Sequence, residues 1–404
     1  MQVGPFGTRS NFARIESRRV LTMLPRCFLF TLLLVVHLPV RSISGLPTVS
    51  VPPRPATWTV LLYMAADNDL EKPILADYNE LERVGSSQQV QFVVQMDRES
   101  GAGRWIVEQD DHRKEIGASI LMDLGKIDSG SVGTLEAFLV WGIEHYPAKH
   151  YALIIAGHGA SWGGVAWDSS TGSYMKIVDL SDMLHRVAGN TGIGAFDVIA
   201  FDACLMGGIE VAEELSDNTN VMVASAQMVD YAGLNYEGFA QAILGQPDAD
   251  GETFGGLLVQ TFGDYYAPSG TSYMLVALDT AKIAGVITAL DDLIAVLDPA
   301  QYEIVGDAYN RSFAYMADYY ADLGHLAENV ADLSDDETVS GAALALAQAI
   351  DEAVLQRVSG PVGVDASGLS IYFPHYTDMQ PEYVAFLRNP VWGRWAAWVG
   401  EMKK

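Results

Sequence analysis

The stretch DVIAFDAC (Asp197–Cys204) decides the fold of this 404-residue chain. Its apolar run is typical of a buried strand in a parallel sheet. A second run, YALIIA (Tyr151–Ala156), ends in the same way, in GHG (Gly157–Gly159). In an open α/β sheet, ligands bind outside the carboxyl ends of the strands. The two runs therefore predict a thiol and an imidazole, those of Cys204 and His158, at one edge of a mostly parallel sheet.

Cys204 and His158 together have the chemistry of a nucleophile and its base. A thiol is only a few per cent thiolate at neutral pH, so it needs activation. The imidazole can take its proton, and we expect a helix over 205–215 whose N-terminus favours the anion. The expected oxyanion donors are the backbone amides of Cys204 and Gly159, since a glycine N–H can approach closely. Taken singly, a cysteine among apolar residues is usually inert and GHG is usually a plain turn. Two matching strand ends favour a cysteine hydrolase.

The N-terminal residues predict export. A basic segment is followed by the apolar run Cys27–Leu38 and then by small residues. This order is typical of a secretory signal, here 1–45, with 46–56 as a tether, and its apolar core is too short to span a bilayer. Cleavage would leave Cys204 as the one cysteine of the mature chain, which in an exported protein indicates a reactive thiol. We expect a secreted, periplasmic or cell-surface protein without a membrane span in its mature part.

The charge of the chain excludes some partners. The net charge is −27, and residues 1–45 carry six Arg and one Glu, a net of +5, so the remainder carries about −32. Such a surface repels nucleic acid and anionic membranes and attracts basic peptides or cations. Solubility is the simplest explanation for most of this charge.

Strand-like and helical segments alternate along the mature chain. The expected parallel strands are 58–64, 89–96, 151–156, 198–201 and 221–225, and the expected helices between them include 68–84 and 134–146. This alternation predicts a doubly wound α/β sheet. We expect a catalytic domain over 57–246 and a mostly helical region over 247–404. Within that region, 272–278 and 369–373 are expected to add strands to the sheet or to a small satellite.

The residues around Cys204 and His158 resemble the catalytic motifs of the clostripain-like cysteine peptidases, relatives of caspases, legumains and gingipains. The two motifs are AGHG (156–159) and FDACLM (201–206). Further segments match the same pattern in the same order: WTVLLYMAADNDLE (58–71), 134–151, EVAEEL (210–215) and GLSIYFP (368–374). The resemblance runs from about Trp58 to about Trp398. It implies a caspase-like three-layer sandwich and an exported endopeptidase with a Cys204–His158 dyad, for which we name no third member.

The resemblance also implies cleavage after Arg or Lys, in protein or peptide substrates. Asp202, two residues before Cys204, is the expected partner of the basic side chain, because residues two apart in a strand point to one face. Asp230 is a second residue that we expect to line the binding pocket for this basic side chain. Family members are often cut between the His and Cys strands after a basic residue, and we expect that cut after Lys176, beyond a Gly/Ser-rich loop.

Calcium is the cofactor that the resemblance suggests, and the sequence assigns no metal ligands. The segment PDADGE (247–252) looks superficially like a calcium loop but lacks the third ligand and the distal Glu. We expect it to be a turn with Asp250 near a helix cap.

Two alternatives to a cysteine peptidase remain open. GASWG (159–163) matches the nucleophile elbow of serine hydrolases, which would make Ser161 the nucleophile. An elbow needs a helix directly after the serine, and residues 163–170 are poor helix formers. The chain could also be an inactive surface-binding protein on a peptidase fold, although both dyad residues are present.

Overall fold

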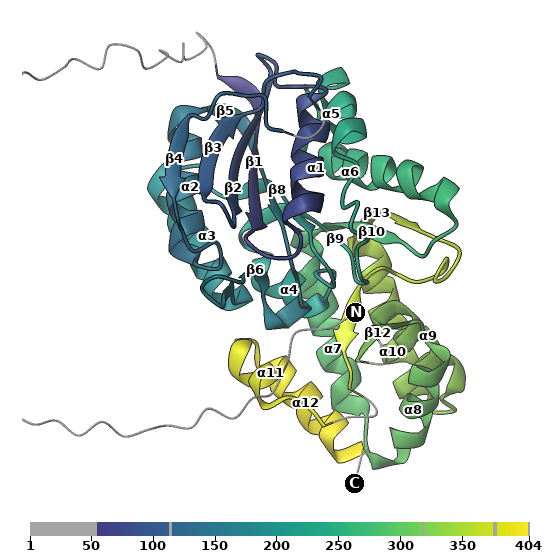
Figure 1. Cartoon of the computed structure of the whole chain (residues 1–404). Helices are drawn as coiled ribbons and strands as arrows, with labels where there is room; N and C mark the ends of the chain where they lie inside the picture. Colours follow the sequence, from purple (N-terminus) through teal and green to yellow (C-terminus); the bar gives the residue numbers. More distant parts are fainter. Residues whose placement is uncertain (1–54, 113–114, 317–318, 375–377, 403–404) are drawn as a thin grey trace, which may run out of the picture. The chain divides into compact units, whose positions relative to one another are not determined.

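A long, mostly parallel sheet runs through the centre of the computed structural model (Figure 1). The structure describes residues 55–112, 115–316, 319–374 and 378–402, so the predicted signal and most of the tether lie outside the described residues. The strands are β1 (Ala56–Ala66), β2 (Val90–Arg98), β3 (Ala102–Ile106), β4 (Met122–Gly125), β5 (Ala148–Ala156), β6 (Val165–Asp168), β7 (Ser173–Met175), β8 (Phe196–Asp202), β9 (Thr219–Ala224), β10 (Met274–Asp279), β11 (Ala314–Tyr315), β12 (Tyr320–Asp322), β13 (Val354–Ser359) and β14 (Ser370–Tyr372).

Within the described residues the central sheet has nine strands, in the order β13-β10-β9-β8-β5-β1-β2-β3-β4. The five central strands, from β9 to β2, are parallel to one another. Antiparallel strands extend both edges: β10 and β13 on one side, β3 and β4 on the other. The predicted α/β class with a mostly parallel sheet is therefore confirmed. The order of strands reverses between β1 and β5, and a ligand crevice is expected at the carboxyl ends of strands at such a point.

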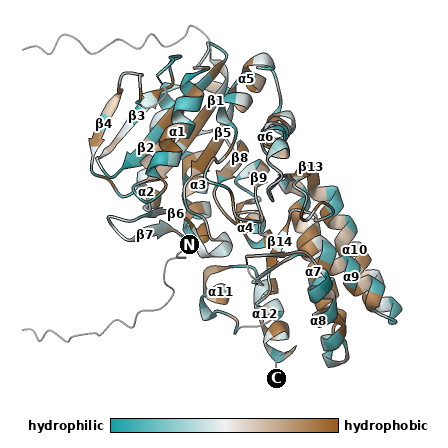
Figure 2. Ribbon diagram, turned by 45° about the vertical axis from the view of Figure 1, so that its right-hand side comes forward, coloured by the Kyte–Doolittle hydropathy of each residue, from teal (hydrophilic) through white to brown (hydrophobic). Residues whose placement is uncertain are grey.

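Helices cover both faces of the sheet (Figure 1). The helices of the described residues are α1 (Glu71–Glu82), α2 (Val132–His145), α3 (Ile177–Thr191), α4 (Ile209–Leu215), α5 (Tyr236–Gly245), α6 (Gly251–Tyr266), α7 (Ile283–Val296), α8 (Tyr302–Arg311), α9 (Leu323–Leu333), α10 (Glu337–Ala353), α11 (Pro381–Phe386) and α12 (Pro390–Met402). Hydrophobic residues gather in the central strands (Figure 2).

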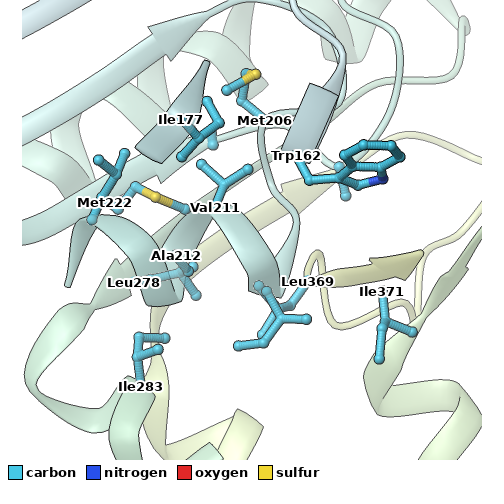
Figure 3. Close-up of a cluster of buried hydrophobic side chains, with 14 of the residues drawn as sticks. Trp162, Ile177, Met206, Val211, Ala212, Met222, Leu278, Ile283, Leu369 and Ile371 are labelled. Atoms are coloured by element: carbon cyan, nitrogen blue, oxygen red, sulfur yellow. The ribbon is translucent and has the colours of Figure 1, made fainter. Parts of the chain in front are cut away.

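Side-chain alternation in the strands divides the core into two layers. In β8, Val198 and Ala200 pack with residues of α1, α5 and α6, whereas Ile199 and Phe201 pack with residues of α2, α3, α4 and α7. A strand buried on both faces accounts for the continuous apolar run in its sequence. Figure 3 shows part of the second layer, where Val211 and Ala212 of α4 lie among Met222, Leu278 and Ile283.

The region after residue 246 contributes to the central sheet and also builds a smaller one. The expected strand 272–278 corresponds to β10 of the central sheet, and 369–373 to β14 of a three-stranded sheet, β11-β12-β14. Gly208, just before α4, pairs with Ser370 of β14. This pairing connects the segment after Cys204 to the C-terminal region.

Several helix boundaries differ from the predicted ones. The helix expected over 68–84 is shorter, Glu71–Glu82, because Asn68 holds a turn before it. The Asn68 side chain donates to the carbonyls of Ala65 and Trp167 and accepts from the Leu70 amide. Asn and Asp side chains favour such turns over helix interiors. Asp250 caps α6 by accepting from the Thr253 amide at 2.9 Å, as predicted.

Among the helices of the described part, none has the length and apolar composition needed to cross a membrane.

Glu210, in the first turn of α4, is a buried acid that connects three elements. Its side chain is 0% exposed, and its Oε1 accepts from the Tyr372 amide at 2.8 Å and the Tyr383 hydroxyl at 2.9 Å. Burial raises the pKa of Glu210 to about 7, although these hydrogen bonds oppose the shift. The folded protein therefore binds this proton more tightly than the unfolded chain does.

We expect the free energy of unfolding to fall as the pH rises from about 4.5 through about 7, because the proton on Glu210 is then lost. A Glu210→Gln variant keeps the acceptor oxygen and cannot ionise. Its free energy of unfolding should therefore fall by about 3 kcal/mol less than that of the parent as the pH rises. Urea denaturation at pH 5 and pH 8 measures it, with the exposed Glu337→Gln as the matched control. An unchanged pH dependence in Glu210→Gln would contradict this role.

Candidate active site

The register of β5 and β8 brings His158 and Cys204 to one edge of the sheet. Ala156 is paired with Asp202, and the Gly157 amide donates to the Asp202 carbonyl at 3.1 Å. His158 and Cys204 each follow two residues after this pair. A Cβ placed on Gly159, the residue after His158, would lie 2.5 Å from the Cys204 carbonyl oxygen, so the two loops are in direct contact.

The thiol of Cys204 is half-buried and lies against a third segment, the loop after β9. Its Sγ accepts from the Val229 amide at 3.4 Å and lies 3.8 Å from the Val229 carbonyl oxygen. Burial raises the pKa of the Cys204 thiol, the Val229 amide opposes this, and the negative charge of Asp202 adds to it. The thiol is therefore protonated at neutral pH and needs a base to become a nucleophile.

The prediction that Cys204 stands at the N-terminus of a helix is wrong. The helix expected over 205–215 begins only at Ile209. Leu205 has a positive φ of 67°, which a helix does not accept, and its amide donates to the Gln227 carbonyl at 3.1 Å. Gly207 approaches the loop after β9 so closely that a Cβ would lie 2.6 Å from the Ala226 amide nitrogen. Contacts with that loop therefore hold the chain in a turn, and the helix dipole does not act directly on the sulfur.

His158 is paired with an acid that the sequence analysis did not identify. Its Nε2 lies 2.7 Å from Oδ1 of Asp69, and the side chains are 40% and 72% exposed. Asp69 follows β1, the strand beside β5 in the sheet. The sequence did contain a signal for this pairing, namely a polar residue just after a third strand. It does not show, however, which strands are neighbours in the sheet. In the described part of the chain, His158 Nδ1 has no hydrogen bond, which leaves it available for proton transfer.

The two predicted oxyanion donors have free amides. Neither the Gly159 amide nor the Cys204 amide donates to an acceptor among the described residues. Gly159 forms an antiparallel bridge with Val165, but the hydrogen bonds of this bridge are made by the adjacent residues. The Ala160 amide donates to the Gly164 carbonyl, and the Ala166 amide donates to the His158 carbonyl. Two unused N–H groups beside a thiol can stabilise a developing negative charge.

Asp202 is buried beside a second acid, Asp77 of α1, and beside Tyr236 of α5. It is 8% exposed and accepts from the Tyr236 hydroxyl at 2.9 Å. Burial raises the pKa of Asp202, and burial followed by the charge of Asp202 raises the pKa of the neighbouring Asp77. Across the described ranges, no ion pair with a basic side chain is present for either acid. This pair of buried acids is therefore electrostatically suited to an incoming cationic side chain.

Asp230 lies one residue after Val229, on the loop that contacts the thiol. Its side chain is exposed and accepts from the Ala232 amide at 3.2 Å. Met228 and Tyr231 on the same loop are 54% and 56% exposed. These two large side chains, on the loop that contacts Cys204, were not predicted, and they expose apolar surface to solvent.

Ser161 and Lys176 differ sharply in accessibility. The Ser161 side chain is 0% exposed, and its turn Ser161–Gly163 leads into β6 and not into a helix. A buried hydroxyl without the elbow geometry cannot serve as the nucleophile. Lys176 is exposed between β7 and α3, with its ammonium 4.4 Å from the ring centre of Phe386. Ile177, the residue after it, is 1% exposed.

Comparisons with known proteins identify the family of this chain. The sequence profile of the Clostripain family (peptidase C11) matches residues 62–400. Clostripain from Hathewaya histolytica is 25% identical over 222 residues, which cover 44% of this chain and 40% of that protein. The chain thus matches less than half the length of this curated relative.

Solved structures share the fold. A secreted C11 cysteine protease from Bacteroides thetaiotaomicron, in complex with an irreversible peptide inhibitor, has a TM-score of 0.66 and 19% identity, covering 85% of this chain and 99% of that one. An inactive zymogen C11 protease from Parabacteroides distasonis has a TM-score of 0.64 and 19% identity, with 86% and 97% covered. Because the family profile spans most of the sequence, this chain belongs to the clostripain family of cysteine peptidases.

Proposed function

We propose that this protein is an exported endopeptidase that hydrolyses peptide bonds after Arg or Lys, with Cys204 as nucleophile and His158 as base. The observation that carries the proposal is the pairing of β5 with β8, which brings an accessible imidazole and a half-buried thiol to one edge beside two free amides. Asp202 is buried and forms no ion pair with a basic residue of the described part of the chain. This supports a preference for substrates with a basic side chain before the scissile bond.

The reaction follows the usual course of thiol proteolysis. His158 takes the proton of Cys204, and Sγ attacks the scissile carbonyl carbon. The amides of Gly159 and Cys204 bind the resulting oxyanion. The imidazolium of His158 then gives its proton to the leaving amine, and water hydrolyses the thioester to free the acid product and the thiol.

Digestion of a peptide library by the purified protein, read by mass spectrometry, tests the proposed specificity. We expect Arg or Lys before nearly every cut. Cuts after acidic or apolar residues would overturn the basic preference and leave the thiol mechanism standing. An absence of cuts from a correctly folded and processed preparation would overturn the peptidase proposal itself.

Asp69 acts in this proposal as a positioning residue, through its contact with His158. We expect Asp69→Ala to lower kcat about 10- to 100-fold while KM changes less than twofold, because orienting an imidazole affects proton transfer more than binding. Asp69→Asn keeps an acceptor oxygen and should recover part of the loss. Thermal denaturation should not distinguish these variants, since Asp69 is 72% exposed.

Glu71→Ala, two residues further along the same segment, is the matched control for Asp69 and should retain wild-type kinetics. A rise in KM with unchanged kcat in Asp69→Ala would contradict a role through His158.

We propose that the chain is cut after Lys176 during maturation. Lys176 is exposed, but its neighbours Met175 and Ile177 are buried, so the bond becomes accessible only when the start of α3 opens. We expect the active preparation to give two fragments on a denaturing gel, and Lys176→Ala to stay a single chain. Active protein that remains one intact chain would refute this cut.

The N-terminal segment supports export, and a fold relative from Bacteroides thetaiotaomicron is described as secreted. We infer that the mature protein acts outside the cytoplasm, as a secreted, periplasmic or surface enzyme.

A further inference from the structure

Three aspartates that are far apart in the sequence meet beside the proposed active site. One carboxylate oxygen from each of Asp67, Asp97 and Asp168 lies within 4.8 Å of those of the other two. The three residues are 4%, 2% and 0% exposed, respectively. Exposed acidic groups often cluster without any ligand, but three buried carboxylates at this distance repel one another strongly.

The fold, and not local sequence, creates this cluster. Asp67 directly follows β1, and Asp97 is the last residue but one of β2, whose Cα partner in β1 is Ala65. Asp168 is the last residue of β6, which is outside the central sheet. The Ser169 amide donates to the Asp67 carbonyl at 2.8 Å and so fixes the end of β6 against the end of β1.

Among the described residues, the hydrogen bonds of the cluster leave the carboxylate of Asp97 without partners. Asp168 is satisfied: its Oδ2 accepts from the Ser129 amide at 3.0 Å and its Oδ1 from the Thr171 amide at 2.9 Å. Within the described residues, neither oxygen of Asp97 has a hydrogen-bond partner. The nearby Ser129 hydroxyl has a single proton, which it donates to Asp168 at 3.3 Å.

A buried carboxylate with two unused oxygens is suited to bind a cation. No ion pair with Asp67, Asp97 or Asp168 is present across the described ranges. Lys126 does not neutralise the cluster, because its ammonium is exposed and donates to the Glu99 carbonyl.

We propose that Asp67, Asp97 and Asp168 bind a calcium ion. All three donors are carboxylate oxygens, the ligands that hard cations prefer, and no His or Cys belongs to the cluster to favour zinc. Calcium binds oxygen at roughly 2.3–2.6 Å, so oxygens up to about 4.8 Å apart fit on opposite sides of one ion. Magnesium dehydrates reluctantly and usually keeps several waters, so a site built from three buried carboxylates suits it less well. Calcium takes six to eight oxygens, so bidentate carboxylates and water would complete its coordination.

The bound ion would hold the two segments that position His158. Asn68 connects these segments through its bonds to the carbonyls of Ala65 and Trp167, at 3.0 and 2.8 Å. Asp69, the next residue, is paired with His158, and the Ala166 amide donates to the His158 carbonyl at 2.9 Å. An effect of the ion on catalysis rests on the proposed role of His158, whereas the binding of the ion does not.

Calorimetric titration of the EDTA-stripped full chain with calcium chloride tests the site. The Cys204→Ala background prevents self-digestion, so the result does not depend on peptidase activity. We expect one ion per chain, and at least a tenfold loss of affinity in Asp97→Asn. Asp248→Asn, in the exposed PDADGE segment, is the matched control and should bind as the parent does.

Thermal denaturation shows whether the variant still folds and gives a second readout. Calcium should raise the Tm of the parent and of Asp248→Asn, because a ligand of the folded state stabilises it, and should leave Asp97→Asn unmoved. In EDTA, Asp97→Asn should melt at or above the parent temperature, since the substitution removes a repelling charge. Magnesium at the same concentration should produce a smaller shift. Calcium binding unchanged in Asp97→Asn, or no calcium binding by the parent, would overturn the proposal.

Discussion

Replacing Cys204 by Ala should abolish peptide hydrolysis, with a loss of at least about 10³-fold in kcat/KM. The substitution removes the sulfur that attacks the carbonyl, and no other thiol exists in the described residues. The fold should persist, because the side chain is only half-buried and loses one atom, so we expect a Tm within a few degrees of the parent. Hydrolysis of a fluorogenic Arg substrate and a thermal melt measure the two quantities.

Two controls separate the thiol mechanism from the serine alternative. Ser161→Ala should keep wild-type activity, because the Ser161 side chain is buried away from solvent. Iodoacetamide should inactivate the parent and modify one residue, Cys204, whereas a fluorophosphonate should leave activity intact. Substantial hydrolysis by Cys204→Ala, or inactivation by the fluorophosphonate, would contradict Cys204 as the nucleophile.

Replacing Asp202 by Asn should cost about 2–5 kcal/mol of transition-state binding for Arg and Lys substrates, or roughly 30- to 4,000-fold in kcat/KM. Asp202 is 8% exposed, so a cationic side chain that reaches it leaves water and depends on the buried carboxylate for compensation. The Tyr236 hydroxyl can donate to the amide oxygen of Asn as it does to Asp, so the local structure should be preserved. Steady-state kinetics on matched Arg, Lys and norleucine substrates measure the loss.

The norleucine substrate is the internal control, since its uncharged side chain gains nothing from the carboxylate. Asp230→Asn should show a smaller loss than Asp202→Asn, because Asp230 is exposed and its charge is screened. Asp248→Asn is the matched control away from the site. Equal losses for the Arg and norleucine substrates in Asp202→Asn would mean that Asp202 has a structural role and not one in recognition.

The apolar runs and motifs predicted the centre of this protein well. The runs at 151–156 and 198–201 form β5 and β8. They are buried on both faces of the sheet, so their residues are continuously apolar, and this pattern can be recognised in the sequence. The strands at the edges were missed. β4 is mostly exposed and β13 is half-buried, so neither carries a strong hydrophobic pattern. The start of α4 was placed four residues too early, because contacts with the loop after β9 override the helical tendency of residues after Cys204.

The sequence by itself determined the α/β class, the family motifs and the two strand ends that carry His158 and Cys204. Those features follow from the apolar composition and the motifs of short contiguous segments, which can be read directly from the sequence. The tertiary structure alone decided that Asp69 meets His158, that Asp202 is buried near Asp77, and that Asp67, Asp97 and Asp168 converge. Each of these depends on which strands are neighbours and on how far they are shifted along one another. Strand order and register are set by packing across the whole sheet, which no local pattern encodes.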